Sequence, residues 1–325
     1  DLSGYAWGVA RKRELLRRED DGSYAVACDG RVWTVQRAAS CLLEPQPGDE
    51  VLIFEPAYDA YRPLIQRAGG VVRAVTLTAP TWRLTQEAIE AAVTPATRMV
   101  LFNNPLNPAA RVFDADEIAA LARVCVRHGL IAVSDEVWEH IVFDGRPHRS
   151  LLSAPGMAER TIKIGSAGKM FGLTGWKVGF ACGAPELITP VAKAHQFLTF
   201  TTAPNLQTAV AAGLGWGADW FWTQGDDLGR SRDRLGAALK AEGYAVTPSE
   251  GTYFLCVDLA ASGLALPDED FCRRIVTEFG VAAIPLSAFE ATPITRTVAR
   301  LCFAKSDAVL DQAAERLGRA RRALI

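Results

Sequence analysis

A single lysine stands in a glycine-punctuated loop whose setting suits covalent chemistry. Lys169 lies in the stretch 165–177, between apolar runs at residues 161–164 and 178–182. A lysine ammonium group that is withdrawn from water loses its proton more readily, and the free amine can then form a Schiff base. Ser166 lies three residues before Lys169 and Lys177 eight after it, and both could face a phosphate group. The stretch therefore suggests an enzyme that uses pyridoxal phosphate (PLP).

Three further side chains belong to the same chemical inventory. Tyr58, Asn107 and Asp135 each come shortly after an apolar, β-rich run. In open α/β sheets, ligands bind beyond the carboxyl ends of the strands, so these side chains should gather with Lys169 at one edge. Catalysis with PLP needs a carboxylate near the pyridine nitrogen, an aromatic ring that clamps the cofactor, and a Schiff-base lysine. The order and the shared location of these residues carry the interpretation.

Strands and helices must together position these residues. Short apolar runs alternate with amphipathic stretches, and one such stretch, residues 114–128, opens with the capping residues Asp114 and Asp116. The runs span residues 50–54, 71–75, 99–102, 130–133, 161–164 and 178–181. Their spacing of roughly 20 to 30 residues predicts βαβ units and a mostly parallel sheet, an α/β fold.

The alternation ends after about residue 185. A long helical pattern follows at residues 226–242, then a strand-like stretch at 251–257, a helix near 268–279 and a strand near 298–303. This order predicts a second, smaller α+β domain behind a helical connector.

Composition excludes several classes of function. The 325 residues are 49% hydrophobic and 22% charged, which is ordinary for a globular protein, and the formal net charge of −2 predicts neither a nucleic-acid nor a membrane partner. No apolar run is long enough to span a membrane. Seven scattered cysteines without a CxxC pair indicate reduced thiols in the cytoplasm. The four histidines, at positions 128, 140, 148 and 195, lack metal-ligand spacing, so no metal site is expected.

The chain resembles the fold-type I PLP enzymes of the class I/II aminotransferase group. Within that group it is similar to the kynurenine, glutamine and methionine aminotransferases and their succinyldiaminopimelate aminotransferase relatives. The matching motifs are residues 47–51 with 55–59, Asn-Pro-Leu-Asn-Pro at 104–108, Ser-Asp-Glu-Val at 134–137, Ser-Ala-Gly-Lys at 166–169 with 174–179, and 300–305. The match runs nearly continuously from about residue 46 to the C-terminus.

The resemblance implies a two-domain fold, with a large PLP-binding domain at residues 20–220, a small C-terminal domain at 221–325 and an N-terminal arm at 1–19. It also implies a homodimer. The function that the resemblance implies is to move an amino group between an L-amino acid and a 2-oxo acid through a Schiff base on Lys169.

The resemblance assigns most of the cofactor contacts. Lys169 would hold PLP and act as the general base, and Asp135 would pair with the pyridine nitrogen. Tyr58 would stack on the ring, and Asn107 would hydrogen-bond the ring 3-oxygen.

The other matching residues would bind the cofactor phosphate, lie near the ring 3-oxygen or bind the substrate. Ser166, Lys177 and Thr34 would hold the phosphate. Arg300 would bind the substrate α-carboxylate in a bidentate pair, which suits a guanidinium fork. Trp138 stands where relatives usually carry a tyrosine, and an indole N–H can donate a hydrogen bond but cannot accept one.

Structural interpretations of several of these residues stay open. Asp135 could cap a following helix, Asn107 could belong to an ordinary turn, Tyr58 could be core packing and Arg300 could form a structural salt bridge.

Alternative functions also stay open. Trp138 motivates a PLP-dependent lyase or oxidase in a specialised pathway. The segment 28–34, which matches the family poorly, motivates a degenerate, non-catalytic relative.

Overall fold

The structure is a computed structural model that describes residues 16–18, 24–28, 31–35 and 48–325. Contacts divide the chain into two units, residues 1–44 and residues 45–325. In the first unit, the described strands β1 (Leu16–Arg18), β2 (Tyr24–Cys28) and β3 (Arg31–Val35) form an antiparallel sheet in that order. The second unit holds all the other described elements.

The central sheet of the second unit is six-stranded and mostly parallel. Its strands, in spatial order, are β5 (Val71–Thr76), β4 (Glu50–Glu55), β6 (Thr97–Asn103), β7 (Ile131–Asp135), β8 (Thr161–Ser166) and β9 (Gly179–Cys182). The first five run parallel, and β9 pairs antiparallel with β8 at one edge. All six strands predicted from the apolar runs are confirmed, and with them the α/β fold class.

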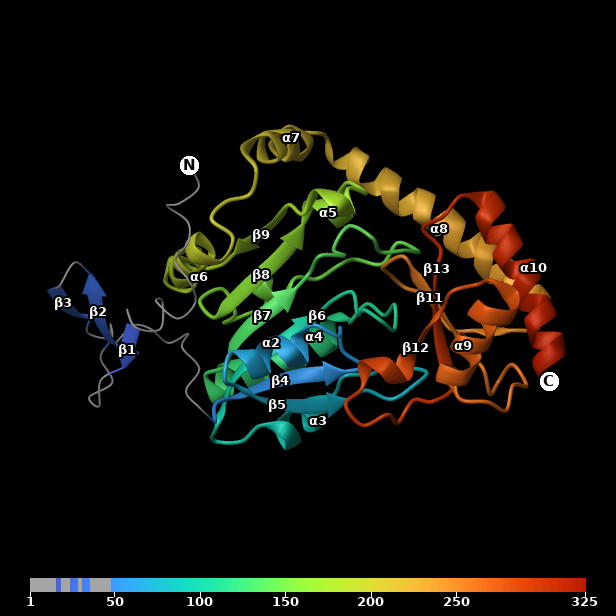
Figure 1. The fold of residues 1–325 in the computed structure, drawn as a ribbon, viewed down its shortest axis with the longest axis horizontal. Coiled ribbons are helices and arrows are strands. Elements are labelled where there is room, and N and C mark those ends of the chain that lie inside the picture. Colours follow the sequence, from blue (N-terminus) through green and yellow to red (C-terminus); the bar gives the residue numbers. More distant parts are fainter. Residues whose placement is uncertain (1–15, 19–23, 29–30, 36–47) are drawn as a thin grey trace. The chain divides into compact units, whose positions relative to one another are not determined.

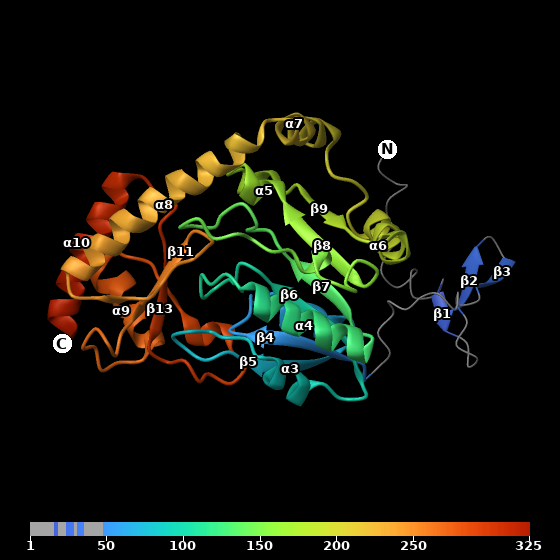
Figure 2. The same ribbon diagram turned by 180° about the vertical axis from the view of Figure 1, so that it is seen from behind.

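Helices cover both faces of this sheet (Figures 1 and 2). The helices along this part of the chain are α2 (Tyr61–Arg67), α3 (Gln86–Ala92), α4 (Ala115–His128), α5 (Ala167–Met170), α6 (Pro185–Leu198) and α7 (Pro204–Leu214). Side chains alternate along a strand, so Val51 and Ile53 of β4 pack with α2, whereas Leu52 and Phe54 pack with α3 and α4.

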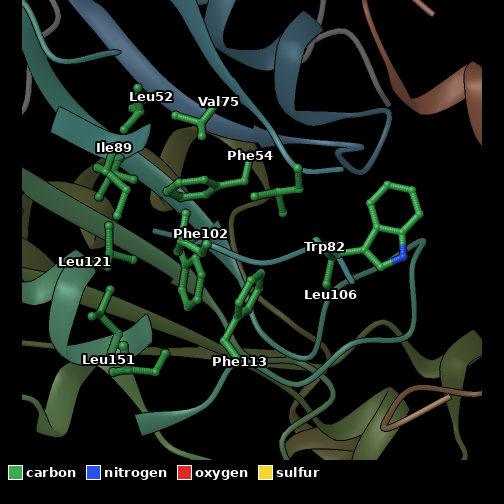
Figure 3. Packing of buried hydrophobic residues seen from close by; sticks show 14 of the residues in the cluster. Leu52, Phe54, Val75, Trp82, Ile89, Phe102, Leu106, Phe113, Leu121 and Leu151 are labelled. Atoms are coloured by element: carbon green, nitrogen blue, oxygen red, sulfur yellow. The ribbon is translucent and has the colours of Figure 1, made fainter. Parts of the chain in front are cut away.

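Aromatic rings fill the core between the sheet and the α3–α4 layer (Figure 3). Phe102 of β6 is fully buried, and its ring centroid lies 5.7 Å from that of Phe54 and 5.0 Å from that of Phe113. Phe102 immediately precedes Asn103, the last residue of β6. The core therefore holds the strand end that leads into the polar edge of the sheet.

Helix α4 connects β6 to β7 and is defined by its sequence at both ends. The Asp114 carboxylate accepts hydrogen bonds from the backbone N–H groups of Asp116 and Glu117, and the Glu117 side chain accepts one from the Asp114 N–H. Such a capping box satisfies backbone donors that the helix leaves unpaired. Gly129 ends the helix in the left-handed conformation, at φ 65°. The predicted helix at residues 114–128 is thus confirmed.

A second, antiparallel sheet lies beyond the carboxyl ends of the parallel strands (Figures 1 and 2). Its order is β10 (Ala245–Val246), β11 (Phe254–Asp258), β13 (Val298–Cys302) and β12 (Ile284–Pro285). Helices α8 (Ala218–Ala241), α9 (Asp268–Phe279) and α10 (Asp307–Leu324) pack around it. The domain boundary at residues 220–221 falls inside α8 and stays a prediction. Within the described residues, no helix combines the length and the apolar character needed to cross a membrane.

Phe102→Ala is expected to destabilise the protein strongly. Removing a fully buried phenyl ring leaves a cavity that the neighbouring rings cannot fill, at a cost of about 3–5 kcal/mol in the free energy of unfolding. Leu64→Ala, at a position on α2 that is 60% exposed, should change this free energy by less than about 0.5 kcal/mol. Urea denaturation measures both variants, and equal losses would contradict this account of the core.

Candidate active site

A cavity of about 430 Å³ opens where the parallel strands end against the second sheet. Six of the residues predicted for the site line it together: Tyr58, Asn107, Asp135, Trp138, Lys169 and Arg300. They come from the segments after β4, β6 and β7, from α5 and from β13. The shared edge expected from the order of the apolar runs therefore exists, and the second sheet closes it from the opposite side.

Asp135 ends β7 and carries a carboxylate that is largely withdrawn from water. Its Oδ2 accepts a hydrogen bond of 2.5 Å from the Tyr61 hydroxyl, and its Oδ1 accepts one of 3.3 Å from the Val137 N–H. Burial raises the pKa of Asp135 and outweighs the hydrogen bond from Tyr61, which lowers it. Burial and the neighbouring carboxylate together raise the pKa of Tyr61 well above its usual value. The raised pKa of Tyr61 keeps its phenol neutral, so its hydroxyl can donate to Asp135.

Two asparagines tie the end of β6 to the end of β7. The Asn103 side chain donates to the Asp135 carbonyl over 3.0 Å and accepts a hydrogen bond of 2.8 Å from the Asn107 N–H. Asn107 in turn accepts a hydrogen bond of 2.5 Å from the Arg300 Nη1 on its Oδ1. A guanidinium only donates, so this contact orients the amide and leaves the Asn107 Nδ2 hydrogens as donors.

Arg300 is held in place chiefly by aromatic rings. Its guanidinium carbon lies 4.0 Å from the ring centroid of Phe254 and 4.9 Å from that of Phe289. Burial lowers the pKa of Arg300 from its usual value, although a guanidinium keeps its charge at neutral pH. Within the part of the chain that the structure describes, Asn107 is its one side-chain hydrogen-bond acceptor. The guanidinium fork therefore has N–H groups left for an anionic partner.

Lys169 sits on α5, a short helix that directly follows β8. The Ser166 hydroxyl accepts a hydrogen bond of 3.4 Å from the Lys169 N–H and caps this helix. The backbone packs closely at Gly168, because a Cβ there would lie 3.2 Å from the Thr174 Cα and 3.3 Å from the Leu173 carbonyl oxygen. This tight turn projects the Lys169 side chain into the cavity.

The Lys169 amine contacts two aromatic side chains. Its Nζ donates a hydrogen bond of 2.9 Å to the Tyr253 hydroxyl. It also lies 4.7 Å from the ring centroid of Trp138. Trp138 is buried and presents a ring face to the amine, but it supplies no oxygen.

Two of the predicted phosphate residues, Ser166 and Lys177, are not among the described residues that line this cavity. Ser166 lies at the foot of α5, and Lys177 is an exposed residue with a left-handed backbone, φ 56°, after the short helix η3 (Thr174–Trp176). Thr34 belongs to β3 in the first unit. Residues 29–30 of the segment 28–34 lie outside the described residues. The phosphate roles of these three residues stay predictions.

A buried charge cluster stands directly behind Asp135. Glu136 is fully buried, and its Oε1 accepts hydrogen bonds from the Ser134 and Ser150 hydroxyls. Burial alone would raise the pKa of Glu136, but hydrogen bonds, the first of them to His148, outweigh it and lower the pKa. The Lys163 ammonium lies 3.8 Å from the second oxygen of Glu136 and pairs with Glu139. Glu136, Glu139 and His148 converge closely enough for a metal ion, and the Lys163 ammonium contacts both carboxylates.

Sequence reasoning did not assign Tyr61, Asn103 and Tyr253 to the site, although all three line the cavity. Tyr61 follows Tyr58 by three residues at the start of α2, and Asn103 stands at the end of an apolar run, so position at a strand end was the available signal. Tyr253 lies just before β11 in the second sheet. No local pattern indicated that this sheet would face the parallel one.

The side chains that line this cavity fit PLP. The amine of Lys169 can condense with an aldehyde, and the Asp135 carboxylate suits a protonated pyridine nitrogen. The Asn107 amide has N–H groups to offer a ring oxygen, and the Tyr58 ring, 42% exposed, presents an aromatic surface. The groups that suit the ring and the aldehyde of the cofactor are thus present within one space, and the phosphate contacts stay predictions.

Comparisons with known proteins agree with this chemistry. The family model "Aminotransferase class I and II" matches residues 33–317. The chain is 42% identical over 292 residues to the probable N-succinyldiaminopimelate aminotransferase DapC of Mycobacterium tuberculosis, covering 86% of this chain and 73% of that protein. It is 40% identical over 311 residues to the methionine aminotransferase of Escherichia coli, covering 95% and 80%.

Solved structures show the same likeness. The N-succinyldiaminopimelate aminotransferase from Mycobacterium tuberculosis superimposes with a TM-score of 0.82, covering 87% of this chain and 74% of that one at 42% identity. The methionine aminotransferase from Escherichia coli gives a TM-score of 0.81, covering 86% and 73% at 40% identity. These matches confirm the resemblance that the motifs indicated. The chain belongs to the class I and II aminotransferases, PLP-dependent enzymes that transfer an amino group between an amino acid and a 2-oxo acid.

Proposed function

We propose that this aminotransferase acts through Lys169, with Asp135 and Arg300 as its two charged partners. The observation that carries the proposal is the convergence of an amine, a carboxylate and a guanidinium on one cavity. Lys169 would bind the cofactor and remove the proton from the substrate Cα. The role of general base suits an amine that the protein holds partly out of water.

The remaining cofactor contacts follow from the same cavity. When bound, PLP supplies an electron sink for the charge that develops at the substrate Cα. Asp135 would keep the ring nitrogen protonated, Tyr58 would stack on the ring, and Asn107 would donate to the ring 3-oxygen. Trp138 would pack beside the amine.

The phosphate contacts rest on the resemblance to the family. Ser166 and Lys177 would hold the phosphate from the lysine loop, and Thr34 would contribute from the N-terminal unit. A hydroxyl donor and a lysine charge are the groups that a phosphate monoester requires.

Arg300 would bind the substrate α-carboxylate in a bidentate pair. The cavity beside it is lined by apolar and aromatic residues, namely Ile284, Ala288 and Phe289. Of the described residues that line the cavity, Lys169 and Arg300 are the cationic ones. We therefore infer an amino donor with an apolar or aromatic side chain, because a second carboxylate would be buried without a matching charge.

The working enzyme would be a homodimer, as the resemblance implies. Phe197, Leu198 and Phe200, which we call the 197–200 surface, are each at least 80% exposed. A patch of large apolar side chains at one point marks an interaction surface, and a second copy of the chain is the partner that the family implies.

The cytoplasm would be its compartment. The cysteines at positions 125, 182, 256, 272 and 302 are free thiols, which suits a reducing environment.

Amino donors with apolar side chains should react with this enzyme faster than acidic ones. With PLP and a panel of 2-oxo acids, kcat/KM for methionine, leucine or phenylalanine should exceed that for aspartate or glutamate about tenfold or more, as an unpaired buried charge costs at least about 1.4 kcal/mol. Product amino acids, separated by chromatography, provide the measurement. Lys169→Ala should show neither turnover nor a cofactor band that borohydride can fix.

Two results would count against this function. Release of ammonia and pyruvate, without formation of a new amino acid, would indicate elimination instead of transamination. Turnover that Lys169→Ala retains at the wild-type rate would remove Lys169 from the mechanism.

Asp135→Asn is expected to stabilise the cofactor-free protein while abolishing most activity. The folded pKa of Asp135 lies above its unfolded value, so the carboxyl favours folding at pH below the unfolded pKa, near 3.9, and loses that contribution as the pH rises through the folded pKa. At about pH 8 the variant should melt above the wild type, and the difference should shrink towards about pH 4. Loss of the partner for the ring nitrogen should lower kcat about 100-fold or more.

Differential scanning calorimetry at several pH values, with kcat measured at saturating donor, tests this prediction. A variant that melts below the wild type at about pH 8 would contradict the conclusion that the buried Asp135 charge destabilises the folded protein. A variant that keeps full activity would remove Asp135 from the cofactor site.

Replacing Phe197 and Phe200 together by Asp should yield a monomer. Two carboxylates in an apolar interface would be buried without partners, which dimers do not tolerate. Light scattering coupled to size exclusion gives the mass in solution. Val309→Asp supplies the control, because Val309 is 48% exposed on α10, at the other end of the second unit from α6 (Figures 1 and 2). A double variant with the wild-type mass would exclude the 197–200 surface from the interface.

A further inference from the structure

We infer that Tyr253 is a positioning residue for Lys169, a hydroxyl that anchors the reactive nitrogen. This inference rests on the proposed function of Lys169. Tyr253 comes from the segment before β11, 84 residues along the chain from the lysine that it contacts. Its ring and hydroxyl line the same cavity as Asp135 and Arg300.

The contact is direct and has no competitor among the described side chains. Lys169 Nζ donates to the Tyr253 hydroxyl over 2.9 Å, a good length for this type of hydrogen bond. Among the side chains that the structure describes, no carboxylate forms an ion pair with Lys169 within 4.0 Å. A lysine side chain has four rotatable bonds, so a single fixed acceptor decides where its nitrogen lies.

Tyr253 is itself held by aromatic packing. Its ring meets Trp138 edge to face, with centroids 4.4 Å apart at 90°, and meets Phe254 at 4.6 Å and 71°. Trp138 and Phe254 are both buried, so neither gives way easily. Such edge-to-face contacts restrict the ring plane and with it the direction of the hydroxyl.

The backbone places Tyr253 beside Trp138. The Thr252 N–H donates to the Ile141 carbonyl over 2.9 Å, and the Ile141 N–H donates to the Trp138 carbonyl over 2.8 Å. Gly251 packs so closely that a Cβ there would lie 2.9 Å from the Ile141 carbonyl oxygen and 3.0 Å from Pro105. These contacts hold the turn before β11 against the segment after β7. Tyr253 and Trp138 therefore form one wall of the cavity together.

The other two tyrosines of the cavity serve other partners. The Tyr61 hydroxyl donates to Asp135, and the Tyr58 ring packs edge to face against Tyr61. Trp138 offers the amine a ring face but no oxygen. Among the described residues, Tyr253 is thus the source of the hydroxyl that reaches Lys169.

A hydroxyl oxygen that accepts from a protonated nitrogen stabilises the proton on it. Once the cofactor is bound, Tyr253 should therefore raise the pH at which the nitrogen that joins residue 169 to it gives up its proton. Removal of the hydroxyl, with the ring retained, should lower that pH and leave Arg300 untouched.

Tyr253→Phe tests the inference. In the PLP-loaded dimer, the pH midpoint of the cofactor absorption band should fall by about one unit, as expected for a lost hydrogen bond to a charged group. In addition, kcat should fall about tenfold at neutral pH, whereas KM for the amino donor should change less than about threefold, because Arg300 remains. A spectrophotometric pH titration, run beside steady-state kinetics, gives both readouts.

Tyr244→Phe is the matched control. Tyr244 is also buried, and its hydroxyl donates to the Leu317 carbonyl over 2.9 Å, remote from the cavity. This variant should lose stability but keep the wild-type midpoint. A Tyr253→Phe midpoint equal to that of the wild type would overturn the inference and leave the proposed function standing. A wild-type protein that forms no cofactor band would overturn both.

Discussion

A carboxylate withdrawn from water at the end of β7 is the constraint on which the rest of the site depends. Placing the Asp135 charge there costs free energy, which the hydrogen bonds from Tyr61 and from the Val137 N–H offset only in part, since the pKa stays raised. A protonated ring nitrogen would supply the missing opposite charge. The cofactor-free protein thus carries a built-in preference for a cationic, planar ligand at this point.

That constraint reaches well beyond one residue. Tyr61 starts α2, so its hydroxyl reaches Asp135 only because β4 and β7 end at the same edge of the sheet. Hydrogen bonds of Asn103 and Asn107 then connect this edge to Arg300 in the second sheet. A chain of hydrogen bonds therefore joins the backbone carbonyl of Asp135, whose carboxylate would hold the cofactor, to the guanidinium that would hold the substrate.

The sequence predicts the parallel part of the fold well. Apolar runs of four or five residues identify β4 to β9, and the capping residue Asp114 marks the start of α4. Tyr58, Asn107 and Asp135 were expected at one edge for the same reason, because parallel strands carry their carboxyl ends together.

Two short strands of the second sheet have weaker signals in the local sequence. β10 and β12 are two residues long, and their pairing with distant partners creates them. α10 is clearly amphipathic and could have been predicted from its periodicity. Tyr253 could not, because its approach to Lys169 depends on how two sheets pack, and that information is spread over Gly251, Ile141 and Trp138.

The stacking of Arg300 between two phenyl rings has a stereochemical consequence. Phe254 and Phe289 flank the guanidinium, so its plane can turn only if the rings move. In the proposed bidentate pair, the substrate carboxylate would share that plane, so its orientation in the cavity would be fixed. With Lys169 on another wall of the cavity, the two mirror-image forms of an amino acid would present different substituents to the same nitrogen. Two aromatic rings that line the cavity would in this way contribute to the choice between the two mirror-image forms of the substrate.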